Sequence, residues 1–260
     1  MIKIIIVLIL LYLYYSLNRT DGFTLLDESS FIKIDNDILD GFYSRIYDDL
    51  YDTIPIHTKE CECIVPYLNA NSDVLCIDSR TGHMVQLLSG TSRIIGLESS
   101  TYFVDRSKQK YPDLSFQYSK YNPFSFKTKT HIICPMFSIH TKNDIGGFLN
   151  VCSNWLMHNG YLFISYMDNI DNITDIINNN PCNKFKYNYK FSLEIEKKPG
   201  HSILSENIYN KDDTMKRKNI WNLNNIQLDN LIHEAGIRGF KFLKECRNKP
   251  FNMAIFIKNT

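Results

Sequence analysis

Two features of the sequence could do chemistry together: the loop Asp78–Gly82 and the carboxylate of Glu98. The loop joins a short apolar run to an amphipathic stretch, and Glu98 ends the next apolar run. Where a strand turns into a helix, backbone N–H groups can hold a ligand, and a carboxylate after the next strand accepts ribose hydroxyls. This spacing predicts a site for an adenosine-containing cofactor. Glycine, which lets the backbone approach a ligand closely, remains only at Gly82.

The elements that must position these residues alternate in type along the middle of the chain. Apolar runs with the length of buried strands occur at 73–77, 93–97, 114–118, 131–136 and 160–166. Amphipathic stretches that predict helices occur at 40–51, 81–89, 100–110 and 144–157. This alternation predicts an α/β fold with a parallel sheet and right-handed crossovers.

The last third of the chain changes its period. Apolar residues alternate with polar ones from Phe185 to Ile195, which predicts a half-exposed antiparallel strand. Residues 203–209 and 217–223 are its expected partners. We therefore expect an inserted antiparallel flap over 184–222. After a helix, two further strands are expected to close the main sheet as a hairpin.

The N-terminus carries an unbroken apolar run from Ile4 to Leu17. A membrane-spanning helix needs about 17–25 such residues, so we expect residues 1–17 to anchor the chain in a membrane as a single pass. A cleaved signal peptide and a buried element of the domain are the alternatives. Residues 18–38 are expected to be a tether, and 39–260 a domain facing the cytosol.

Composition narrows the possible partners. The net charge of +1 gives no general attraction to nucleic acid. The seven cysteines are odd in number and scattered, which favours reduced thiols. Cys61-Glu-Cys63 is not followed by a second pair at zinc spacing, so no metal site is predicted. The sequence does not indicate an oligomeric state.

Five motifs in the sequence match, in the same order, those of a known protein family. They are Tyr43–Leu50 (Tyr-Ser-Arg-Ile-Tyr-Asp-Asp-Leu), Leu75–His83 (Leu-Cys-Ile-Asp-Ser-Arg-Thr-Gly-His), Thr130–Ile139, Asn154–Leu162 and Arg217–Asn219. Together they resemble the membrane-anchored class I S-adenosylmethionine-dependent methyltransferases of large DNA viruses, over about residues 40–258. The resemblance implies a doubly wound, mostly parallel seven-stranded sheet of class I methyltransferase type, with S-adenosylmethionine as cofactor. It does not identify the methyl acceptor.

The resemblance also assigns roles to individual residues. It implies that Glu98 holds the ribose, and that Lys120 stands where an aspartate commonly meets the adenine amino group. Cys76 replaces the usual acid on the first strand. The cofactor-binding candidates on this basis are Tyr43, Tyr47, Asp78, Ser79, Arg80, Thr81, Gly82, Glu98, Lys120 and Cys134.

Several of these candidates have two interpretations. Tyr43 and Tyr47 could cover the cofactor or face the core. Arg80 could bind the carboxylate of the cofactor bidentately, or Asp78 and Arg80 could neutralise each other across an empty pocket. His140 could act as a base near the acceptor or be a hydrogen-bonded structural residue.

Two functions follow from these observations. The first is a membrane-tethered methyltransferase that transfers a methyl group from S-adenosylmethionine to an unknown acceptor. The second is a catalytically inactive methyltransferase fold that serves as a binding or scaffold module, because the cofactor loop departs from the glycine-rich pattern. Fold by itself does not decide between them.

Overall fold

A computed structural model describes residues 32–51, 53–120, 126, 128–173, 189–248 and 251–259. The chain divides into Met1–Phe31 and a compact unit, Ile32–Thr260. The expected anchor, residues 1–17, and the tether up to residue 31 lie outside the described residues. Within the described part of the chain, no helix is both long enough and apolar enough to cross a membrane.

The compact unit is built on a seven-stranded sheet with the strand order β10-β11-β6-β5-β2-β3-β4. The strands are β2 (Asp73–Ile77), β3 (Arg93–Glu98), β4 (Ser115–Tyr118), β5 (Lys129–Cys134), β6 (Leu156–Tyr166), β10 (Phe240–Asn248) and β11 (Phe251–Lys258). Strands β4, β3, β2, β5 and β6 pair in parallel, and the hairpin β10–β11 joins β6 antiparallel. The predicted mostly parallel seven-stranded sheet is confirmed.

Helices cover both faces of this sheet, which is why its strands are apolar on both sides. They are α3 (Thr53–Ile64), α4 (His83–Leu88), α5 (Thr101–Lys110), α6 (Ile145–Trp155) and α8 (Leu228–Ile237). Helices α6 and α8 share a core cluster with Leu75 and Ile77 of β2. Helices α3 and α4 share another cluster with Val74 and Cys76 of the same strand. Alternate residues of β2 therefore face opposite layers.

The predicted flap is a second, four-stranded sheet in the order β1-β9-β8-β7. Its strands are β1 (Ile32–Ile34), β7 (Tyr189–Lys198), β8 (His201–Asn210) and β9 (Met215–Asn224). Strands β7, β8 and β9 are antiparallel, and β1 adds to β9 in parallel. The compact unit thus begins at Ile32, inside the expected tether. Asp35 explains this, because its carboxylate accepts hydrogen bonds from the backbone and side chain of Asn222 on β9.

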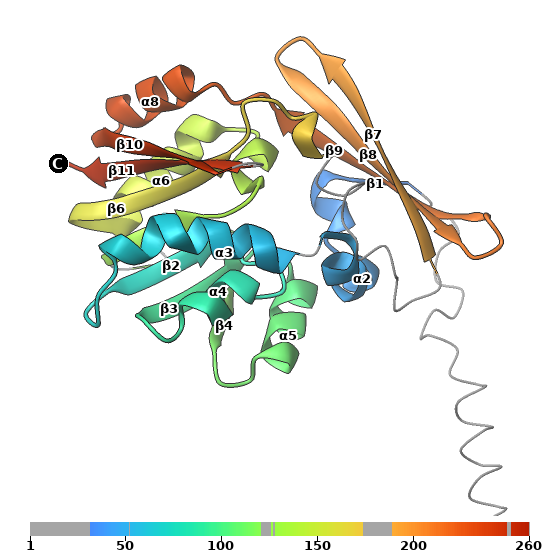
Figure 1. The fold of residues 1–260 in the computed structure, drawn as a ribbon, viewed down its shortest axis with the longest axis horizontal. Coiled ribbons are helices and arrows are strands. Elements are labelled where there is room, and N and C mark those ends of the chain that lie inside the picture. Colours follow the sequence, from blue (N-terminus) through green and yellow to red (C-terminus); the bar gives the residue numbers. More distant parts are fainter. Residues whose placement is uncertain are drawn as a thin grey trace, which may run out of the picture. The chain divides into compact units, whose positions relative to one another are not determined.

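Helix α2 (Gly41–Tyr51) lies between the flap and the main sheet, as Figure 1 shows. Its apolar face joins a core cluster with Leu204 and Ile208 of β8 and with Phe103 of α5. Asp40 accepts a hydrogen bond from the Tyr43 N–H at the start of the helix and binds the Arg217 guanidinium through both oxygens, at 2.8 and 2.7 Å. Arg217 therefore joins the flap to the beginning of α2.

Candidate cofactor site

The loop after β2 keeps a backbone shape that suits glycine, although only one glycine remains. Asp78, Arg80 and Gly82 have φ angles of 52°, 49° and 87°. For residues other than glycine, this left-handed region costs about 1–2 kcal/mol each. Gly82 is also required by packing, because a Cβ there would lie 2.7 Å from the Phe116 ring. The surrounding structure therefore holds Asp78 and Arg80 in a conformation that their side chains disfavour.

Arg80 binds Glu98, the predicted ribose ligand. The Arg80 Nη1 atom lies 3.2 Å from Oε2 of Glu98, and the Arg80 backbone N–H donates to Oε1. The Glu98 side chain is 1% exposed and that of Arg80 9%, so this ion pair is largely buried. Both carboxylate oxygens thus already accept hydrogen bonds from a residue of the loop.

The pKa of Glu98 reflects two opposing effects. Burial raises the pKa, and the charge of Arg80 lowers it, with burial the larger effect, so that the pKa rises to about 7. A carboxyl group with a raised pKa destabilises the fold as it ionises, between about pH 4.5 and 7. Arg80 offsets part of that cost.

Asp78 has a different partner from Arg80. Its Oδ2 atom lies 2.5 Å from Nζ of Lys142, which follows the short helix η4 (Ser138–Thr141). Asp78 is thus paired with Lys142, and Arg80 with Glu98. The reason is topological, because β2, β3 and the segment after β5 all end at the same edge of the sheet.

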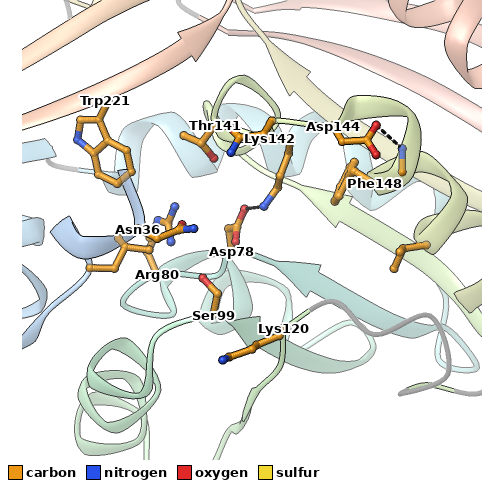
Figure 2. A pocket seen from close by; sticks show the side chains of 14 residues that line it. Asn36, Asp78, Arg80, Ser99, Lys120, Thr141, Lys142, Asp144, Phe148 and Trp221 are labelled. Atoms are coloured by element: carbon orange, nitrogen blue, oxygen red, sulfur yellow. Dashed lines mark hydrogen bonds and ion pairs between the residues drawn. The ribbon is translucent and has the colours of Figure 1, made fainter. Parts of the chain in front are cut away.

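A cavity of about 740 Å³ opens beside the Asp78–Lys142 pair. Figure 2 shows Lys142 pointing at Asp78, with Ser99 and Lys120 on the adjoining wall. The lining comes from the loops after β2, β3 and β4, from η4 and α6, and from the flap. Its residues are Asn36, Leu39, Asp78, Arg80, Ser99, Lys120, Thr141, Lys142, Asn143, Asp144, Gly147, Phe148, Val151 and Trp221. This volume lies in the ordinary range for small-molecule sites.

The other loop residues fix the loop to its surroundings. The Thr81 hydroxyl donates to Asp48 on α2, and Lys110 of α5 also binds Asp48 at 2.7 Å. Ser79 is buried, and its Oγ atom has no hydrogen-bond partner among the residues described. The loop is thus attached to α2 by Asp48, a residue inside the Tyr43–Leu50 motif that received no role from the sequence.

Tyr43 and Tyr47 face the core and do not line the large cavity. Both are at most 2% exposed, and both rings meet Phe103 edge-on. The Tyr43 hydroxyl donates to Glu206 of β8 at 2.7 Å. Cys134, another predicted cofactor residue, is fully buried in the core beneath α6. Of the two interpretations of the tyrosines, the structure supports the core-facing one.

Both ring nitrogens of His140 are occupied by main-chain groups. Nε2 accepts the N–H of Met167 at 3.0 Å, so Nδ1 carries the proton and donates to the Asn224 carbonyl at 2.7 Å. The side chain is fully buried, and burial lowers its pKa to about 4. His140 is therefore placed as a structural residue, and neither nitrogen is directed at a substrate.

This geometry predicts a pH-dependent stability. Neutral His140 stabilises the fold above its unfolded pKa of about 6.5, and the contribution is lost as the pH falls through about 4. We expect the stability advantage of the wild type over His140→Gln to shrink by about 3 kcal/mol between pH 7 and pH 4. Urea denaturation at each pH measures it, and Glu98 cancels in the difference. The exposed His158→Gln is the control; an advantage that stays constant with pH would contradict the prediction.

Most of the cavity lining was not predicted from sequence, Lys142 and Trp221 included, and neither was Glu206, which binds α2 from the flap. Lys142 lies shortly after the motif Thr130–Ile139, but its position in the sequence does not indicate which residue it binds. Glu206 carried a usable signal, because Leu204 and Ile208 flank it at two-residue spacing and so place it on the inward face of the strand. Trp221 has a weaker signal of this kind in β9, because only Leu223 is apolar at two-residue spacing from it.

The residues present fit S-adenosylmethionine poorly in this arrangement. The ribose hydroxyls need acceptor oxygens, and those of Glu98 already accept from Arg80. The sulfonium is a cation, and Lys120 adds a positive charge to the wall of the cavity. Ribose hydroxyls bound at Glu98 would compete with Arg80 for the same carboxylate oxygens.

Comparison with known proteins identifies the fold. No protein-family model and no curated protein matches the sequence. Among solved structures, an S-adenosylmethionine-dependent methyltransferase from Clostridium acetobutylicum matches with a TM-score of 0.64 and 12% identity, over 84% of this chain and 98% of that one. The CcbJ methyltransferase from Streptomyces caelestis matches with 0.64 and 11%, over 78% and 95%.

An S-adenosylmethionine-bound amino pentose methyltransferase from Micromonospora echinaspora matches with a TM-score of 0.59 and 10% identity, over 84% of this chain and 97% of that one. At such identities the likeness concerns the arrangement of strands and helices, and it says nothing about retained chemistry. The chain has the fold of the class I S-adenosylmethionine-dependent methyltransferases.

Proposed function

We propose that this chain is a membrane-tethered, methyltransferase-like protein whose cofactor site is closed by its own side chains, and that it acts as a binding module. The observation that carries the proposal is the buried ion pair between Arg80 and Glu98. An arginine that fills the ribose position competes directly with the cofactor for the same carboxylate. The strained backbone at Asp78 and Arg80 supports the proposal further, because these side chains stand where a close ligand approach would favour glycine.

A second candidate is an active methyltransferase in which Arg80 swings away when the cofactor arrives. The open cavity and the position of Glu98 at the end of β3 favour it. In that case the cofactor must break a largely buried ion pair, and part of its binding free energy is consumed.

The two candidates differ in one measurement on the full chain. We expect millimolar S-adenosylmethionine or S-adenosylhomocysteine to leave the melting temperature unchanged and to give no heat of binding. A ligand present at about 100 times its Kd stabilises by about 2.7 kcal/mol, which raises the melting temperature of a protein this size by roughly 5–10 °C. A rise of that size would overturn the binding-module proposal in favour of the enzyme.

The membrane tether rests on the apolar run Ile4–Leu17 and on the resemblance to membrane-anchored viral proteins. The tether would hold the domain at the cytosolic surface of a membrane. Expressed in cells, the full chain should remain in the pellet after alkaline carbonate extraction, whereas a chain lacking residues 1–17 should be released. Release of both chains would remove the tether from the proposal.

A further inference from the structure

The two sides of the Asp78–Lys142 ion pair differ greatly in the space that they offer. Between the loop, α2 and the segment after β5, a void of about 10 Å³ remains, bordered by Tyr47, His57 and Arg80. This holds about one water molecule at most. On the other side lies the cavity of about 740 Å³. Of these two spaces, the one on the side of Lys120 is the one that admits a ligand of more than a few atoms.

The charges on the cavity wall are compensated unequally. Arg80 is paired with Glu98, and Lys142 with Asp78. Asp144 caps α6 by accepting the N–H of Gly147 at 2.8 Å, so the positive end of that helix partly offsets its charge.

Lys120 differs from these residues. It is exposed and lies at the cavity, and no carboxylate is paired with it in the described ranges. Figure 2 shows its side chain on the wall below Asp78 and Ser99. Among the lysines and arginines that line the cavity in the described part of the chain, Lys120 is thus the one whose charge no carboxylate neutralises.

The rest of the wall suits an organic ligand with a flat, partly apolar body. Phe148 and Trp221, both mostly buried, line opposite sides of the cavity in Figure 2. The Ser99 and Thr141 hydroxyls and the Asn36 side chain add hydrogen-bonding groups to the lining. Aromatic side chains with a few polar groups are typical of sites for small organic molecules.

We propose that this cavity binds an organic anion that carries a planar ring, with Lys120 as the residue that recognises its negative charge. The proposal rests on the proposed function in one respect. Arg80 must stay bound to Glu98, so that the ribose position at Glu98 remains closed. A phosphate or carboxylate group then lies at Lys120, and the ring lies between Phe148 and Trp221. A cationic ligand is disfavoured at the same place.

Adenosine 5′-monophosphate tests the proposal, because it combines a planar ring with a dianionic group, and adenosine is its uncharged counterpart. We expect the full chain to bind adenosine 5′-monophosphate at least tenfold more tightly than adenosine, with an affinity that falls as the salt concentration rises. Lys120→Gln should weaken the nucleotide about tenfold, as expected for the loss of one charge-assisted hydrogen bond. Lys120→Glu should weaken it further. Lys108→Gln, at an exposed lysine of α5 away from the cavity, should leave the affinity unchanged.

Equal affinity for adenosine and its monophosphate, no binding of either, or full binding by Lys120→Glu would each overturn the proposal. Titration with S-adenosylmethionine separates this result from the proposed function. If the wild type binds S-adenosylmethionine, the closed site is wrong whatever the nucleotide does. If it binds neither, the closed site stands and the anion proposal fails. Circular dichroism of each Lys120 variant checks that the fold is retained.

Discussion

Replacement of Asp78 and Arg80 by glycine is expected to give a protein that binds S-adenosylmethionine and S-adenosylhomocysteine. Both positions have left-handed φ angles, so glycine relieves about 1–2 kcal/mol of strain at each. Loss of the Arg80 side chain exposes the acceptor oxygens of Glu98, and loss of the Asp78 carboxylate removes a negative charge beside the loop. Millimolar S-adenosylhomocysteine should raise the melting temperature of the double variant by roughly 5–10 °C.

Without ligand, the same variant should be less stable than the wild type. The variant removes one partner from each of two ion pairs, Arg80–Glu98 and Asp78–Lys142. Such a loss costs about 3–5 kcal/mol for a buried pair, which the relief of strain offsets only in part. Arg80→Lys is the matched control: it keeps a positive charge beside Glu98 and should remain unresponsive to ligand. If the double variant folds, as judged by circular dichroism, yet shows no melting shift, then Arg80 is not the obstacle and Lys120 or helix α2 excludes the cofactor.

Glu206→Ala is expected to lower the free energy of unfolding by about 3–5 kcal/mol. Glu206 is fully buried on β8 and accepts hydrogen bonds from Tyr43, Tyr51 and Asn219. Truncation leaves these donors buried without an acceptor, and each such group costs about 1–3 kcal/mol. That loss is a large part of the 5–15 kcal/mol by which a domain is typically stable.

Urea denaturation of the full chain measures the change, and Glu194→Ala on the exposed face of β7 serves as the control. The control should stay within about 0.5 kcal/mol of the wild type. Glu206→Gln should lie between the two, because its amide keeps one acceptor oxygen but turns a donor toward the other partners. A Glu206→Ala variant as stable as the control would show that the flap does not hold α2.

Glu206 also bears on function, because the network reaches the candidate site. The carboxylate joins α2 to the flap, and Asp48 on the same helix binds Thr81 of the loop. Burial raises the pKa of Glu206, and its hydrogen bonds lower it in part. Arg217 fixes the start of α2 from the same sheet. The closed loop, α2 and the flap thus form one connected structure.

The sequence by itself determined the architecture, because periodicity is a local property. Continuous apolar runs mark strands covered on both faces, and this marked β2 over residues 73–77. Strict alternation marks a strand with one exposed face, and this predicted the flap, although the described first strand begins at Tyr189. The order of motifs placed Asp78, Arg80 and Glu98 at one edge of the sheet. The departure from glycine in the loop was likewise visible in the sequence.

Only the tertiary structure decided which side chains meet at that edge. Arg80 lies closer in sequence to Asp78, yet it binds Glu98, while Asp78 binds Lys142 from beyond β5. Tyr43 faces Glu206 across more than 160 positions, and not a ligand. Such pairings depend on strand order and on the direction of each side chain, which no local pattern encodes. The physical reason is that a buried charge must find a partner in space, and the fold, not the spacing along the chain, determines which partner is within reach.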